Sequence, residues 1–136
     1  MKYIFEVPGK VTGKGRPRVN TSTGIAYTPT KTKDYETLIE QYFFLKYPRF
    51  KKIEARVRVE IEACFAVPKT ASIKEKEQML SGSISPTKKP DIDNIAKIVL
   101  DALNQIAFKD DNQITQIVVN KKYADVDKLV VLIEEY

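Results

Sequence analysis

The sequence predicts an α+β domain in which helices pack on a small mixed or antiparallel sheet. Residues 54–67 alternate strictly between apolar and polar side chains, residues 93–107 are apolar around most of a helical circumference, and two β-rich runs, 114–123 and 127–134, end the chain. The length of 136 residues is typical of one domain. We therefore expect residues 1–136 to form a single domain with the element order β-α-β-α-α-β-β.

The first half of the chain contains a strand, a long loop and a helix. Residues 2–7 have strand composition and are followed by Pro8 and Gly9. Residues 8–30 form a loop rich in Gly, Pro, Thr and basic residues, and a loop of this length in a compact domain usually has a function. Residues 30–47 predict a helix that Pro48 ends. Its expected inner positions are Tyr35, Leu38, Ile39, Tyr42 and Phe43.

Residues 54–67 form the clearest strand. A half-buried strand places alternate side chains on opposite faces of its sheet. The expected buried face carries Ala55, Val57, Val59, Ile61, Ala63, Phe65 and Val67. Ser72 followed by Glu75 predicts a capping box that opens a short charged helix ending near Leu80, and residues 81–89 are a Ser/Gly/Pro loop.

Residues 93–107 predict the most strongly amphipathic helix. Its polar side chains form a narrow stripe of Asp93, Lys97, Asp101 and Asn104. The apolar positions are Ile95, Ala96, Ile98, Val99, Leu100, Ala102, Leu103 and Ile106.

Composition excludes several kinds of site. The chain has no histidine, which excludes Ser-His-Asp and Cys-His nucleophiles and histidine-rich metal sites. Cys64 is the only cysteine, so neither an internal disulfide nor a thiolate zinc cluster can form. Neither a secretory signal nor an apolar run of about 20 residues is present, and we expect a cytoplasmic protein. The net charge of +5 favours a polyanionic partner because the basic residues are clustered.

Acidic residues at both ends of helix 93–107 predict a metal site. Asp91 and Asp93 stand at its entrance after Pro90, and Asp111 follows its end. Asp91 and Asp93 have an ordinary alternative role as an N-cap and a first-turn acid, and Asp111 as a solvated turn acid. For Lys97, four residues after Asp93, the alternative is an i,i+4 ion pair with Asp93. Converging carboxylates need neutralisation, however, and Mg²⁺ accepts carboxylates, waters and substrate phosphate oxygens together.

The loop 8–30 predicts contacts with phosphates. Its basic residues are interleaved with glycines, which allow backbone amides to approach a phosphate, and with prolines, which limit its flexibility. The spacing is not that of a Walker loop. A solvated, partly disordered loop is the alternative. The expected DNA-binding residues are Lys10, Lys14, Arg16, Arg18, Lys31, Lys33, Lys88 and Lys89.

The segments 89–104 and 108–114 resemble the signature of the RusA-type Holliday junction resolvases, which are crossover-junction endodeoxyribonucleases. A weaker match lies near the start of the chain, where residues 13–18 and 27–35 are similar to the phage and prophage branch of that family. Position 105 departs from the pattern, since Gln105 stands where many members have a glycine that ends the helix.

The resemblance implies a Mg²⁺-dependent nuclease of DNA recombination and repair, with Mn²⁺ as a substitute ion. Asp91, Asp93 and Asp111 would be the metal ligands, and Lys97 an essential catalytic lysine. The enzyme would be a homodimer that cuts four-way junction DNA. A nuclease for other branched phage DNA and a non-catalytic DNA-binding module are the alternatives.

The spacing of the acids raises a geometric difficulty. A helix from Asp93 to Ile106 rises about 20 Å, whereas the extended step from Ile106 to Asp111 spans only about 17 Å. The Asp111 side chain therefore cannot easily reach Asp93 of its own chain. We hypothesise that Asp111 completes the site of a second subunit.

Overall fold

A computed structural model describes residues 1–136, and its main sheet has four strands in the order β1-β6-β4-β5. These strands are β1 (Lys2–Pro8), β4 (Val57–Ala66), β5 (Ile114–Ala124) and β6 (Lys128–Glu135). Strand β6 pairs antiparallel with both β1 and β4, whereas β5 pairs parallel with β4. The sheet is therefore mixed, and the α+β class predicted from the sequence is confirmed.

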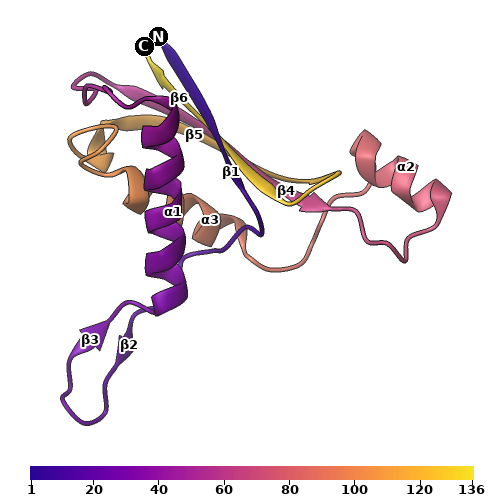
Figure 1. The fold of residues 1–136 in the computed structure, drawn as a ribbon, viewed down its shortest axis with the longest axis horizontal. Helices are drawn as coiled ribbons and strands as arrows, with labels where there is room; N and C mark the ends of the chain where they lie inside the picture. The colour runs from indigo at the N-terminus through magenta and orange to yellow at the C-terminus, as the bar shows by residue number, and fades with distance from the viewer.

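Helices α1 (Thr30–Lys46) and α3 (Ile92–Leu103) pack against each other, and α1 also runs along β1 (Figure 1). Their buried residues join alternate residues of β1, β4 and β6 in one hydrophobic core of 22 residues. The connection from β4 through α3 to β5 is the crossover that two parallel neighbouring strands require. Helix α3 thus has one side in the core and one side free to carry polar groups.

Helix α2 (Ile73–Ser81) lies far from α1 and has no buried residue (Figure 1). The expected capping box is present, because Ser72 accepts from the Glu75 N–H and Glu75 accepts from the Ser72 N–H. None of the helices is both long and apolar enough to cross a bilayer.

Three features differ from the expected elements. A two-stranded hairpin, β2 (Arg18–Val19) with β3 (Ala26–Tyr27), interrupts the expected loop 8–30 and extends below α1 (Figure 1). Strand β4 begins at Val57 rather than residue 54. The side-chain amide of Gln113 donates to the carbonyls of Ile53 and Ala55, just before the strand. Helix α3 ends at Leu103 rather than residue 107, since Gln105 takes a left-handed φ of 65°.

Tyr47, just beyond α1, binds the outer side of β1. Its hydroxyl accepts the Ile4 N–H at 2.8 Å and donates to the Ile4 carbonyl at 3.0 Å. This side chain occupies both outward-facing backbone groups of Ile4, where a further strand would otherwise pair.

Candidate metal and nucleic-acid site

The amino end of α3 presents two carboxylates without partners. Asp91 is the N-cap residue, and its carbonyl accepts the Ile95 N–H at 3.1 Å, but its side chain makes no capping hydrogen bond. Asp93 lies in the first turn, and both acids are exposed and form no ion pair. The capping interpretation of Asp91 therefore does not describe its carboxylate, which is free to bind a ligand.

Lys97 lies one turn further along α3. It is exposed and has no carboxylate within 4.0 Å, so the ion pair with Asp93 considered above does not form. Its ammonium group is therefore available to a bound anion.

Asp111 begins the short 3-10 helix η1 (Asp111–Gln113), which leads into β5, and is exposed. Gln113 fixes this turn, because its side-chain amide donates to the carbonyls of Ile53 and Ala55 at 2.9 and 2.8 Å. Its side-chain oxygen accepts the Asp110 N–H at 3.0 Å. Gln113 is thus a positioning residue for Asp111, and only the contacts in the folded chain reveal that role.

The acids of one chain do not converge. No group of three or more acidic or cysteine side chains in the chain is arranged to hold a metal ion. Asp91 and Asp111 lie beyond opposite ends of α3, whose 12 residues span about 18 Å. One chain therefore does not bring the three carboxylates together, as the spacing of the acids along the sequence led us to expect.

Lys14 joins the basic loop to two helices. Its ammonium lies 2.9 Å from Glu36 of α1 and 3.0 Å from Asp101 of α3, and its side chain is only 16% exposed. Burial alone would lower the pKa of Lys14, but the hydrogen bonds and charges of the two acids outweigh it and raise that pKa. Burial, assisted by the charge of Glu36, also raises the pKa of Glu40. Lys14 thus stabilises the loop, and its charge is already paired within the chain.

Glycines let this loop lie directly on the amino end of α3. A Cβ on Gly13 would come within 2.7 Å of the Pro90 Cβ and 3.1 Å of the Asn94 Cβ. The Lys14 N–H donates to the Asn94 carbonyl at 2.9 Å beside this contact. The close approach places the loop's basic residues next to Asp91.

Three adjoining hollows surround the loop, and basic side chains line each of them. Arg16 and Lys89 line the hollow that also contains Asp91. Lys10, Lys31 and Lys89 line a second, and Arg16, Arg18 and Lys31 a third. The expected DNA-binding residues in this group therefore border one continuous surface beside the exposed acids of α3.

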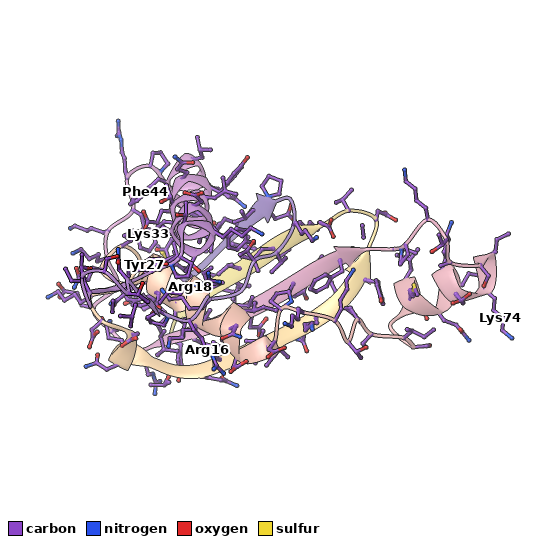
Figure 2. All side chains as sticks on the ribbon, turned by 90° about the horizontal axis from the view of Figure 1, so that it is seen from below. Arg16, Arg18, Tyr27, Lys33, Phe44 and Lys74 are labelled. Atoms are coloured by element: carbon purple, nitrogen blue, oxygen red, sulfur yellow. The ribbon has the colours of Figure 1, made fainter.

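Two expected DNA-binding lysines lie outside these hollows. Lys33 is exposed on α1, and Lys88 lies over the Phe65 ring at 5.5 Å from its centroid. Figure 2 shows Arg16, Arg18 and Lys33 in the half of the molecule that carries α1, with Lys74 of α2 at the opposite end. Lys33 and Lys88 thus stand apart from the basic surface that the three hollows form.

Comparison with known proteins assigns this arrangement to a family. Residues 8–134 match the family model described as Endodeoxyribonuclease RusA. The chain belongs to the RusA endodeoxyribonuclease family. It is also 33% identical over 138 residues to the uncharacterized protein YqaN of Bacillus subtilis (strain 168), covering 96% of this chain and 94% of that protein.

The RusA match extends well beyond the signature segments found in the sequence. It includes the basic loop, the hairpin and all four strands of the main sheet in whole or in part. Membership of the RusA family supports a nuclease that hydrolyses DNA, and the exposed acids beside a basic surface are the chemical groups suited to that activity.

Proposed function

We propose that this RusA-family protein is a Mg²⁺-dependent endonuclease that resolves Holliday junctions in DNA recombination and repair, acting in the cytoplasm on nucleoid DNA. The observation that carries the proposal is the pair of unpartnered carboxylates, Asp91 and Asp93, beside a hollow lined by Arg16 and Lys89. Acids without protein partners suit a cation, and neighbouring basic groups suit the phosphates of a DNA strand.

Each residue has a distinct role in this proposal. Asp91, Asp93 and Asp111 would hold Mg²⁺, or Mn²⁺ in its place, and the bound ion would supply a hydroxide and neutralise phosphate charge. Lys97, which has no ion-pair partner, offsets negative charge on the phosphate under attack. Arg16 and Lys89, which line the hollow that also contains Asp91, bind phosphates of the DNA backbone.

A homodimer suits both the chemistry and the substrate. One chain does not bring Asp111 to Asp91, so a second copy is needed to supply the third carboxylate. Two copies related by a two-fold axis also carry two equivalent sites, and resolving a four-way junction requires paired cuts.

A cleavage assay tests the activity and its substrate. A synthetic four-way junction and a linear duplex of matched sequence are incubated with the protein in Mg²⁺ or in EDTA. We expect cleavage of the junction in Mg²⁺ only. Equal cutting of both substrates would contradict junction specificity, and tight binding without cutting would identify a non-catalytic DNA-binding module.

Asp93→Asn tests the assigned residue. We expect this variant to lose cleavage while binding the junction as tightly as the wild type, because the amide keeps the shape and removes the ligand charge. Glu77→Gln, at an exposed acid of α2, is the matched control and should cut normally. Normal cleavage by Asp93→Asn would refute the assignment.

A further inference from the structure

The hairpin of β2 and β3 presents apolar side chains to solvent. Every residue from Arg16 to Tyr27 is exposed, and the hairpin projects beyond the amino end of α1 (Figure 1). Val19 is 60% exposed, Ile25 66% and Tyr27 46%. A two-stranded hairpin that buries none of its apolar side chains gains little stability from its own packing. These side chains are therefore available to a partner.

Backbone contacts hold the hairpin in one shape. At its tip, the Asn20 side-chain oxygen accepts two backbone N–H groups of the turn at 2.9 and 3.3 Å, and Gly24 takes the left-handed φ of 70° that the turn requires. At its base, the Gly15 N–H donates to the buried Thr32 hydroxyl at 2.9 Å. An element that is ordered before binding loses little conformational entropy when it binds.

The segment that carries the hairpin has positive charge only. Residues 8–33 contain no Asp or Glu, and their basic residues are Lys10, Lys14, Arg16, Arg18, Lys31 and Lys33. All of these except Lys14 are without an ion pair. Free positive charges around exposed apolar groups suit an anionic partner that also offers apolar surface. Nucleic acid offers both, in its phosphates and in the faces of its bases.

The register of the hairpin brings a basic and an aromatic side chain together. Arg18 pairs directly with Tyr27 (Figure 2). Residues directly opposite each other in antiparallel strands have their side chains on the same face. An aromatic ring binds a base by stacking, and a guanidinium binds a phosphate. The pair therefore matches the two parts of one nucleotide.

A row of basic residues connects the hairpin to the acids of α3. Arg16 lines the hollow that contains Asp91, and it also lines the neighbouring hollow, to which Arg18 contributes. A DNA strand that follows these side chains from Asp91 is therefore led to the face of the hairpin that carries Tyr27.

Branched DNA differs from a continuous duplex in the bases that it exposes. Inside a duplex each base is stacked between its neighbours, so a protein ring reaches it only at the cost of unstacking. Where strands part at a branch point, a base face is open to solvent. We propose that Tyr27 stacks on a base at the branch point while Arg18 binds the adjoining phosphate. This inference rests on the proposed nuclease function and makes Tyr27 a specificity-determining residue for branched DNA.

Binding measured without cleavage tests the role of the ring. Fluorescence anisotropy in EDTA gives the affinities for a labelled four-way junction and for a linear duplex of matched sequence. Tyr27→Ala should weaken junction binding about 5- to 150-fold, the effect of losing one stacked base, and leave duplex binding unchanged. Tyr27→Phe keeps the ring and should bind as the wild type.

Phe44→Ala is the matched control, because it removes a 42% exposed aromatic ring near the carboxyl end of α1, away from the hairpin. This variant should bind both DNAs as the wild type does. A Tyr27→Ala protein that binds the junction as tightly as the wild type, or that loses equal affinity for junction and duplex, would overturn the proposal.

A fluorescent base reports the stacking itself. 2-Aminopurine at the branch point should be quenched when saturated with the wild type or with Tyr27→Phe, and should stay bright with Tyr27→Ala. The same base within one arm of the junction is the control and should not respond. Equal quenching by the wild type and Tyr27→Ala would overturn the proposed stacking.

These readouts need no cleavage, so the two proposals fail separately. Junction binding that depends on Tyr27, in a protein that cuts no DNA in Mg²⁺, would support the stacking and refute the nuclease. Junction cleavage by the wild type, combined with unchanged junction binding by Tyr27→Ala, would leave the nuclease and refute the stacking. A wild type that binds neither DNA would overturn both.

Discussion

Replacing Lys14 should show whether this basic residue serves the fold rather than the substrate. Lys14→Met removes two ion pairs, to Glu36 and Asp101, whose side chains are only 18% and 34% exposed. It also leaves two carboxylates whose oxygens, each about 3 Å from the same nitrogen, are at most about 6 Å apart.

A charged hydrogen bond contributes about 1.5–3 kcal/mol, and partial exposure reduces that value. We therefore expect the free energy of unfolding to fall by about 2 kcal/mol. At about 4 °C per kcal/mol for a chain of this size, the melting temperature should drop by about 8 °C.

Calorimetry at several pH values checks the electrostatic origin of this loss. Because the pKa of Lys14 is raised in the folded state, its stabilisation is complete below the unfolded pKa of about 10.4 and is lost as the pH rises through the folded value. The gap between wild type and Lys14→Met should therefore be constant from neutral pH to about 10 and shrink above it.

Lys10→Met is the control, since Lys10 is exposed and forms no ion pair. A Lys14→Met protein as stable as Lys10→Met would refute the reasoning.

Four further substitutions test the loop and the ends of α2 and α3. Gly13→Ala should destabilise the protein by about 1–3 kcal/mol in denaturant titrations, because its Cβ would lie 2.7 Å from Pro90; an unchanged midpoint would show that the loop moves freely. Gln105→Gly should raise the free energy of unfolding by about 0.5–1 kcal/mol, because glycine relieves the φ of 65° at this position. Gly82→Ala, at φ 90°, should lower the free energy of unfolding by about 1 kcal/mol. If both substitutions changed it in the same direction, this account would be contradicted. Arg16→Met should weaken junction binding and lower the slope of log affinity against log salt by about 1; an unchanged slope would exclude a phosphate contact.

The sequence predicted the elements whose signals are local. The alternation in β4, the Ser72–Glu75 capping box and the apolar sides of α3 all depend on neighbours a few residues apart, and the structure has them. The expected buried face is wrong only at its two ends, since Ala55 is exposed before β4 begins and Val67 is half-buried after it ends. The hairpin of β2 and β3 was missed because two residues per strand are too few to show a period.

The features of the site that the sequence did not predict depend on contacts between residues far apart in the chain. Lys14 lies between two glycines and Arg16 between a glycine and a proline, so their local settings are similar, and only the fold brings Glu36 and Asp101 to Lys14. Gln113 likewise acts on carbonyls some 60 positions earlier in the chain. Neither role has a periodic or local signal in the sequence. The sequence therefore predicted which side chains belong to the site better than it predicted which residues those side chains contact.

The hydroxyl of Tyr47 has a consequence for how many copies can assemble. A sheet with two open borders could add strands at both, and successive copies would grow into a fibre. Here Tyr47 occupies the backbone of Ile4 on one border, so growth can proceed only from the other. A sheet that can add strands at one border alone cannot extend into a fibre of successive copies.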